Sequence, residues 1–549
     1  MRSDSASVLD TLTQRGAQTA MRWKRYGVWQ TISGAAMAAR VTSIAQGLRG
    51  IGLKDGDVAG IIGDNCAEWV LADVAIVAAG GISAGFDAQS DFDELARMLN
   101  ETRTRILFVA GDVQLHKAMT VRARCAHLQT IIVMHQGWDD GSDATAAMPM
   151  ADLEAKGSDN TALPARDDDA PAFIITTSGM TGPARGAILS GRAVATQAAR
   201  AAKALGLTPD DERLSLIPIH HVLERVVGIH ASLLSGTIIN FSENRETALA
   251  NLVELQPTVI LAAPQTWARL KGGIELAMMD ATSFQRWACR KAFAGSSLGD
   301  PLVLAPIRRR IGLGRARLCL SGGAPMRDDV AAWFTAISRP LTDIYGHAET
   351  GGAVALAGQA INGHRLDRDG GVSSDTLYLG YAGHGAVALK TWSSGDIAIR
   401  GGDALRVVGR SAHLLGDNKS PFAAERALIA SPFIADAFLH QEGGHVMAHI
   451  LIESDAVVKY AQDKSIPFTH FLSLCRSDDI RALIASVIAD TNATNDITIA
   501  DFMLIERALG PDDAEVSPVL ALRRHRLRDD TTDRAKDTAR LATLETIQT

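Results

Sequence analysis

Several features that would place a chain in a special class are missing from this sequence. Its five cysteines are scattered and odd in number, without the spacing of a metal site, so we expect reduced thiols in a cytoplasmic protein. No apolar segment follows Arg2, which argues against a secretory signal peptide. The longest apolar stretch, residues 69–85, contains Asp73 and falls short of the roughly 20 residues that a membrane-spanning helix needs. We therefore expect at most peripheral contact with a membrane.

Basic charge is also scarce. The 55 Lys and Arg are outnumbered by 62 Asp and Glu, and the net charge of −7 gives no reason to expect nucleic acid or an anionic membrane as a partner. The sequence has no short-period repeat, low-complexity tract or heptad run. A chain of 549 residues with an apolar share of 47% is instead typical of a globular protein of two or more domains.

From Asp57 onward, short apolar runs alternate with amphipathic stretches, the pattern of parallel β/α layering. This pattern predicts helices between successive strands, and two such series follow one another. We therefore predict an α/β fold whose large N-terminal region contains two stacked sheet layers. The first series has predicted strands at 58–62, 81–86, 105–110 and 130–134 and helices at 68–79 and 91–100; the second has predicted strands at 214–217, 237–241, 258–262 and 317–321.

The composition changes near Arg410. A predicted helix at 421–430 and predicted strands at 434–440 and 445–453 indicate a smaller α+β domain. We therefore divide the chain into an N-terminal domain, residues 1–410, and a C-terminal domain, residues 411–549. The charged tail that begins at Arg523 is predicted to be a solvated surface helix.

A loop rich in glycine and hydroxyl side chains, TSGMTGPARG, occupies residues 177–186 after the apolar run 172–175. Glycines let backbone N–H groups approach phosphate oxygens, and hydroxyl groups add further donors. The loop is not a Walker motif, because no Gly-Lys-Ser/Thr follows the glycines at the required spacing. Alone, such a stretch is more often an ordinary loop than a phosphate site.

Further motifs accompany this loop in a fixed order. They are LSLIPIHHVLER at 214–225, SGGAP at 321–325, YGHAET at 345–350, SGD at 394–396 and GR at 409–410. Together they resemble the adenylate-forming superfamily, and the LPxxHxxER-like segment resembles its long-chain fatty acyl-CoA synthetase branch. The resemblance extends over about residues 25–525. It implies that family's fold, in which a large N-terminal domain carries a smaller, mobile C-terminal domain.

The resemblance also implies a reaction in two steps. A fatty acid reacts with MgATP to form acyl-AMP, and the thiol of CoA then displaces AMP. The enzyme contributes mainly positioning and stabilisation of charge. ATP, Mg²⁺ and CoA are thus the expected ligands besides the acid, and a homodimer is a possible assembly.

By the same resemblance, individual residues receive roles. Glu349 would hold Mg²⁺ and His221 would lie beside the acyl carboxylate, while Thr181 and Arg185 would act on the phosphates. Tyr345 would stack on the adenine ring. The residues expected to bind the nucleotide are Thr177, Ser178, Gly179, Met180, Thr181, Gly182, Gly186, Gly322, Gly323, Ala324, Tyr345, Gly346, Asp396 (for the ribose hydroxyls) and Arg410.

Several residues of the expected ATP site depart from the family pattern. Met180 and Ala348 each replace a threonine and so remove a hydroxyl group. Arg185 replaces a lysine and keeps the charge on a bulkier, planar group.

The C-terminal motif departs further. The segment EVSPVLALRR, residues 515–524, resembles ELTPTLKLRR, and Ala521 stands where that motif has the lysine that bridges carboxylate and α-phosphate. Loss of one such donor costs roughly 10²–10³ in rate. Arg523 and Arg524 are the nearest cations along the chain. The hinge segment after Arg410 is also shorter than the family's, which bears on thioester formation.

Two other functions compete with that of a fatty acyl-CoA ligase. A pseudoenzyme would bind nucleotide or an acyl ligand in a lipid pathway without turnover, as Ala348 and Ala521 suggest. A ligase that passes its acyl group to a carrier protein is the third hypothesis, although the marker insertion of that branch is not evident. Glu349, Asp396 and Arg410 match the family and favour the enzyme.

Overall fold

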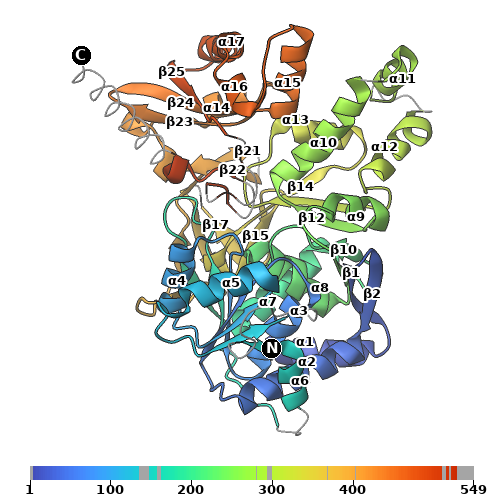
Figure 1. Cartoon of the computed structure of the whole chain (residues 1–549), viewed down its shortest axis with the longest axis vertical. Coiled ribbons are helices and arrows are strands. Elements are labelled where there is room, and N and C mark those ends of the chain that lie inside the picture. Colours follow the sequence, from blue (N-terminus) through green and yellow to red (C-terminus); the bar gives the residue numbers. More distant parts are fainter. Residues whose placement is uncertain are drawn as a thin grey trace.

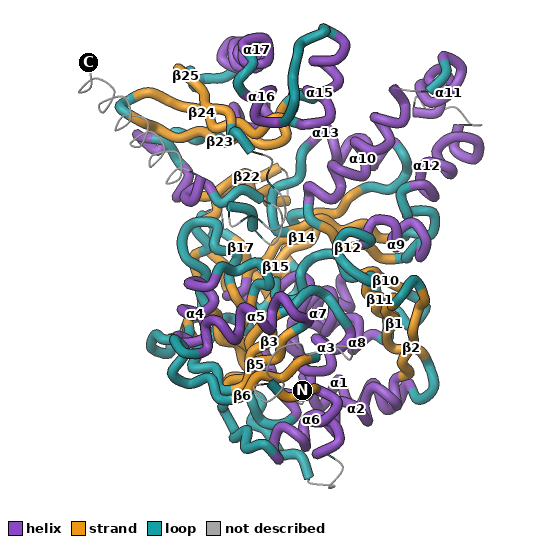
Figure 2. Tube along the Cα trace, viewed as in Figure 1, coloured by secondary structure: helices purple, strands orange, loops and turns teal. Residues whose placement is uncertain are grey.

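The computed structural model describes residues 4–134, 147–157, 162–279, 281–293, 299–367, 369–401, 404–507, 509, 513, 515–517 and 521–527 (Figure 1). Two large sheets and their helices form the body of the molecule, and a smaller α+β domain lies at one end (Figure 2). This arrangement confirms the predicted α/β fold with its two stacked sheets.

The first large sheet has eight strands in the order β19-β9-β8-β4-β3-β5-β6-β7. Its interior pairs are parallel, and β9 closes one edge by pairing antiparallel with both β8 and β19. The strands are β3 (Val58–Ile62), β4 (Ile82–Phe86), β5 (Ile106–Val109), β6 (Thr130–Val133), β7 (Met148–Pro149), β8 (Pro171–Thr176), β9 (Gly186–Ser190) and β19 (Gly380–Tyr381).

The second large sheet has nine strands in the order β16-β15-β14-β13-β12-β10-β11-β1-β2. Its central strands are parallel and both edges are antiparallel. The strands are β1 (Thr19–Arg25), β2 (Val28–Ser33), β10 (Glu212–Leu214), β11 (Ile238–Phe241), β12 (Val259–Ala262), β13 (Leu318–Gly322), β14 (Leu341–His347), β15 (Gly352–Leu356) and β16 (Gln359–Ala360).

Helices lie between the two sheets and on both outer faces. The inner layer packs against both sheets, and every residue of α3 except Glu68 is buried, which explains the apolar run at 69–79 that only Asp73 interrupts. The inner layer comprises α1 (Asp4–Arg15), α2 (Gly34–Gly50), α3 (Ala67–Ala78), α7 (Gly191–Leu205), the π-helical η1 (Leu223–His230) and α8 (Ala231–Ser235), with α6 (Met150–Lys156) beside α2. The outer layers comprise α4 (Phe92–Glu101) and α5 (Gly111–Arg122) on the eight-stranded sheet, and α9 (Ala248–Leu255), α10 (Pro264–Met279), α11 (Ser283–Phe293), η2 (Asp300–Leu304), α12 (Ala305–Arg310) and α13 (Asp328–Ala336) on the nine-stranded sheet.

The smaller domain has its own apolar core, drawn from residues 415–504. Its sheet order β23-β24-β25 combines an antiparallel pair with a parallel one, as expected of an α+β unit. Its elements are α14 (Phe422–Ile429), β23 (Ile434–Glu442), β24 (His445–Ile452), α15 (Ser454–Asp463), α16 (Phe471–Cys475), α17 (Asp478–Thr494) and β25 (Ile499–Leu504). Two small sheets lie between the two units, β17 (His364–Leu366) with β18 (Gly371–Ser374) and β20 (Thr391–Ser393), and β21 (Asp396–Gly401) with β22 (Ala404–Arg410). The chain also forms three short 3₁₀ turns, η3 (Ala348–Thr350), η4 (Ser411–His413) and η5 (Gly416–Asn418).

One strand prediction was displaced. Residues 214–217 were expected to form a strand, but β10 spans Glu212–Leu214. Beyond it, the Ile217 carbonyl accepts a hydrogen bond from the Asn65 side chain (2.7 Å) instead of pairing in the sheet. The predicted tail helix lies mostly outside the described residues, which end at Leu527.

Adjacent charged residues of η1 tie the inner helical layer to both sheets. The Arg225 guanidinium is fully buried and donates to Asp73 of α3 (2.5 Å) and to the Ile174 carbonyl of β8 (2.9 Å). Its neighbour Glu224 accepts from Arg213 of β10 (2.9 Å) on the other sheet. Burial alone would raise the pKa of Asp73, but Arg225 and then His230 outweigh it and hold that pKa well below its ordinary value.

Arg225→Met should lower the free energy of unfolding by about 3–5 kcal/mol, because Asp73 would remain charged in the core without its main partner. The matched control is Arg192→Met, which removes an exposed pair with Asp169 and should cost at most about 1 kcal/mol. Urea denaturation of the two variants beside the wild type tests this; equal losses would show that Arg225 does not hold the layers together.

Candidate functional site

The glycine-rich loop connects β8 to β9 at the carboxyl end of β8. Its ends close on each other, because the Thr177 N–H donates to the Arg185 carbonyl (2.8 Å) and the Arg185 N–H donates to the Thr177 hydroxyl (2.9 Å). Gly179 adopts a φ of 63°, which glycine tolerates best. The predicted phosphate-binding residues Ser178, Met180, Thr181 and Gly182 therefore belong to one closed turn, and Gly186 begins β9 directly after it.

Glu349 lies in η3 and is only 7% exposed. One side chain that the sequence did not indicate, that of Tyr381, connects Glu349 to this loop. Tyr381 of β19 donates its hydroxyl proton to Glu349 Oε1 (2.7 Å), and the Arg185 guanidinium lies over the Tyr381 ring (5.3 Å to the centroid). Burial, and then the Glu349 charge, raise the pKa of Tyr381, so the hydroxyl stays protonated. Only the antiparallel pairing of β19 with β9 brings Tyr381 here, so no local signal could have revealed it.

Asp396 is the centre of a second polar cluster. Its carboxylate accepts from the Tyr345 hydroxyl (2.7 Å), lies 2.8 Å from His347 Nε2 and forms an ion pair with Arg410 Nε (3.1 Å). Burial alone would raise the pKa of Asp396, but His347 and then Arg410 outweigh it and keep the carboxylate ionised. The structure thus brings together Asp396, Tyr345 and Arg410, which the sequence assigned to the nucleotide, and adds His347 of the YGHAET motif, which the sequence did not indicate.

A row of aromatic rings connects the two clusters. Successive ring centroids lie 4.8–6.5 Å apart along the row Tyr381, Tyr378, Trp392, His347 and Tyr345. These rings therefore form a continuous row from Glu349 and the phosphate loop to Asp396, near the carboxyl ends of strands, where α/β sheets commonly bind ligands.

The glycines of the SGGAP and YGHAET motifs have a packing role as well as the predicted contact with nucleotide. A Cβ atom on Gly322 would lie 2.6 Å from Ile344, and one on Gly346 would lie 2.1 Å from the Gly352 carbonyl oxygen. Gly323, with a φ of 90°, then turns the chain toward Ala324. Any larger side chain at 322 or 346 would force β13, β14 and β15 apart.

His221 is buried at the start of the segment that leads into η1. Its Nδ1 accepts from the Leu223 N–H (3.3 Å), which fixes the ring. Burial, and then the neighbouring His220 and His347 rings, lower the pKa of His221 to about 3. The ring is therefore neutral at physiological pH. Because Nδ1 is the acceptor, Nε2 carries the proton and can donate one hydrogen bond.

Ala521, in place of the expected lysine, lies against the large domain. Its N–H donates to the Ser517 hydroxyl (3.0 Å) and its carbonyl accepts from the Ser517 N–H (2.8 Å). The methyl group packs against the apolar cluster that includes Val222 and Tyr378. The position itself thus faces the site, while the charge is missing.

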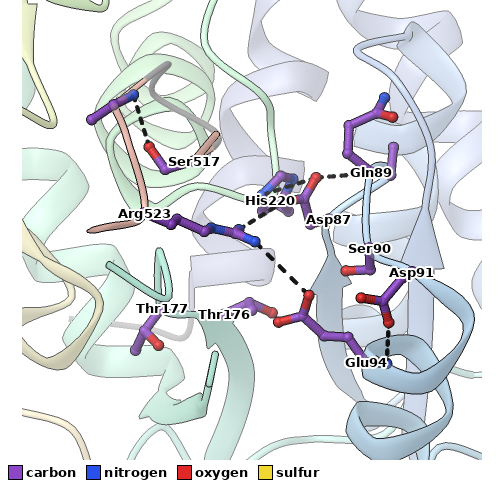
Figure 3. Close-up of polar contacts among 12 residues, drawn as sticks. Asp87, Gln89, Ser90, Asp91, Glu94, Thr176, Thr177, His220, Ser517 and Arg523 are labelled. Carbon is purple, nitrogen blue, oxygen red and sulfur yellow. Dashed lines mark hydrogen bonds and ion pairs between the residues drawn. The ribbon is translucent and has the colours of Figure 1, made fainter. Parts of the chain in front are cut away.

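The two arginines after Ala521 diverge. Arg524 turns back to the smaller domain and forms a bidentate pair with Glu425 (2.7 and 2.9 Å). Arg523 enters the large domain, buried to 6% exposure, and lies 3.6 Å from Asp87 and 3.9 Å from Glu94. Figure 3 shows its guanidinium between His220 and Glu94, close to Thr176 and Thr177, with which it lines a small pocket. Of the two candidate substitutes for the lysine, Arg523 is therefore the one beside the phosphate loop.

Among the described residues, no three His, Cys, Asp or Glu side chains gather as a metal site. Glu349 would therefore have to hold Mg²⁺ together with ligand oxygens, which suits a hard cation that is commonly bound by one or two carboxylates plus phosphates. No helix of the described part of the chain is long and apolar enough to cross a membrane.

A profile of the family described as AMP-binding enzyme matches residues 10–376. The rat long-chain-fatty-acid–CoA ligase ACSBG2 is 24% identical over 501 residues, which cover 78% of this chain and 74% of the relative. The long-chain-fatty-acid–CoA ligase FadD15 of Mycobacterium bovis is 24% identical over 551 residues, covering 91% and 90%.

Solved structures show the same fold. The A domain of a carboxylic acid reductase from Segniliparus rugosus, in complex with AMP and a co-purified carboxylic acid, has a TM-score of 0.78 at 17% identity and covers 98% of this chain and 94% of its own. ATP-bound MatB from Rhodopseudomonas palustris has a TM-score of 0.71 at 18% identity, covering 96% and 99%.

His221 should not titrate between about pH 5 and pH 8, because its pKa of about 3 lies far below the ordinary value near 6.5. Since the unfolded chain binds this proton more readily, the stability that neutral His221 contributes should decline as the pH falls from about 6.5 toward 3. Histidine-selective ¹⁵N NMR, with the signal assigned by His221→Gln, measures the ring directly. A midpoint above pH 5 would contradict the assignment.

Proposed function

This chain belongs to the AMP-binding enzyme family, and from that premise we propose that it is a long-chain fatty acyl-CoA ligase. It would activate a fatty acid with MgATP to acyl-AMP and transfer the acyl group to CoA. The observation that carries the proposal is the row of aromatic rings that connects the phosphate loop and Glu349 to Asp396. The relatives named as ligases give no support to a pseudoenzyme.

Each part of the site has a proposed task. The loop at 177–186 binds the β- and γ-phosphates through backbone N–H groups and hydroxyls, and Arg185 adds positive charge. Glu349 holds Mg²⁺, whose chemistry is to neutralise the negative charge on the phosphates. Asp396 accepts the ribose hydroxyls after exchanging the Tyr345 and His347 contacts, and neutral His221 hydrogen-bonds the acyl carboxylate.

We further propose that Arg523 supplies the cation that Ala521 cannot. Its guanidinium lines a pocket with Thr176 and Thr177, where the phosphate loop begins, and Arg523 follows Ala521 by only two residues. The carboxylates of Asp87 and Glu94 hold the guanidinium there and also offset part of its positive charge. Arg523 would therefore stabilise the developing charge less well than a lysine at 521.

The free thiols of all five cysteines favour a cytoplasmic location. A homodimer and a domain boundary after Arg410 complete the proposal.

Ala521→Lys should raise the rate of fatty-acid-dependent ATP–pyrophosphate exchange, by as much as roughly 10²–10³-fold, because it restores a donor that acts on the transition state. Ala521→Met, of similar length but uncharged, should leave the rate unchanged. Acyl-CoA formation is followed separately. Absence of exchange in both wild type and Ala521→Lys, over a broad panel of acids, would refute the ligase proposal.

Arg523→Ala should lower the same exchange rate much more than Arg526→Ala. Both arginines pair with Glu94, but only Arg523 lines the pocket with Thr176 and Thr177. Arg523→Lys should recover part of the activity. Equal losses in the two alanine variants would show that Arg523 only anchors the segment.

A further inference from the structure

The helical projection on the outer face of the nine-stranded sheet has a surface unlike that of the rest of the chain. It comprises α10, α11, η2 and α12, and in Figures 1 and 2 α11 lies at its outer tip, away from both sheets. Ala292 is the only buried residue of α11. This helix therefore contributes little to the core and presents most of its side chains outward.

Large apolar side chains are concentrated on this projection. Of the fourteen that are exposed in the described part of the chain, four lie between residues 276 and 302. Phe284 is 72% exposed and Trp287 50%, and their rings stack at 5.8 Å. Leu302 of η2 is 71% exposed, and Leu276 of α10 is 45% exposed. Exposure of this much aromatic and aliphatic surface in one short region is typical of an interaction site.

The same segment has a net charge of the opposite sign to that of the whole chain. Residues 264–310 contain eight Lys and Arg but three Asp and Glu, a net charge of +5 in a chain of net charge −7. Of these acids, Glu275 pairs with Lys271 (3.2 Å) and Asp300 with Arg308 (2.6 Å). Arg290, Lys291 and Arg310 are exposed on α11 and α12, while Arg286 lines a pocket with Glu275 and Cys289.

We propose that this surface binds the headgroup region of an anionic lipid bilayer. We call it the basic tip and define it by Leu276, Phe284, Trp287, Arg290, Lys291, Leu302 and Arg310. Aromatic rings favour the membrane–water interface, and each basic side chain gains from a negative lipid surface. Neither the apolar side chains nor the basic side chains alone would give firm attachment to a membrane, but the two together do.

A second copy of this chain is the less favoured occupant. A twofold contact through the basic tip would place two surfaces of like charge against each other, which is unfavourable. A negative bilayer meets the same charge with its opposite. The proposal concerns binding alone and does not depend on the proposed reaction.

Flotation with lipid vesicles tests the proposal on the full chain. Wild type should bind vesicles of 70% phosphatidylcholine and 30% phosphatidylglycerol and should bind pure phosphatidylcholine weakly. It should be released by 0.5 M NaCl, because strong screening at that ionic strength shortens the range of the electrostatic attraction. Arg290→Glu with Lys291→Glu should weaken partitioning by about tenfold or more. Phe284→Ser with Trp287→Ser should weaken it at unchanged salt dependence.

Two controls match these changes. Tyr26→Ser removes an aromatic side chain that is 84% exposed on the β1–β2 hairpin, and Lys203→Glu with Arg365→Glu reverses two exposed bases elsewhere. Neither should alter partitioning, and thermal unfolding checks that all variants fold. Failure of the wild type to float with anionic vesicles, or equal losses in the controls, would overturn the proposal. So would a dimer in solution that only the basic-tip variants dissociate, since that would assign the surface to a second copy.

Discussion

The buried pair Arg225–Asp73 is the interaction on which the rest of the architecture depends. Arg225 joins α3 and β8 of one sheet, while the adjacent Glu224 reaches β10 of the other. His221 lies only three residues before Glu224 in the same segment. The positions of Glu224 and Arg225 therefore also fix the position of the His221 ring. A buried arginine without its carboxylate would be costly, so the two sheets must close together around this pair.

The proposed nucleotide site is pre-organised by contacts that a bound nucleotide would have to replace. Asp396 already holds the Tyr345 and His347 side chains, and Glu349 holds Tyr381. Preformed donors orient both carboxylates in a largely buried environment, where an unpaired charge would be expensive. Ribose hydroxyls would therefore exchange one set of hydrogen bonds for another, and binding would gain less than a count of new contacts suggests.

The sequence predicted what local patterns determine. Buried strands such as β3 and β12 were correct because continuous apolar runs bounded by turns mark them. Residues 216–217, in contrast, continue an apolar run after the last hydrogen bond to β11, which Ser215 donates. Tyr381 and His347 were not predicted, since their roles arise from pairings between distant strands. The net charge of the whole chain likewise concealed the positive charge of residues 264–310, because a sum carries no information on position.

The C-terminal segment belongs to both units of the molecule. Arg524 is bound to Glu425 of the smaller domain in bidentate geometry, whereas Arg526 contacts Asp91 and Glu94 of α4 at 3.3–3.4 Å. Partly exposed ion pairs of the latter kind contribute little stability and separate readily. Buried Arg523 is the stronger tie to the large domain. If the smaller domain rotates, as the resemblance to the adenylate-forming superfamily implies, Arg524 would carry the segment with it. Withdrawal of buried Arg523 from Asp87 and Glu94 would then account for most of the free-energy cost of the rotation.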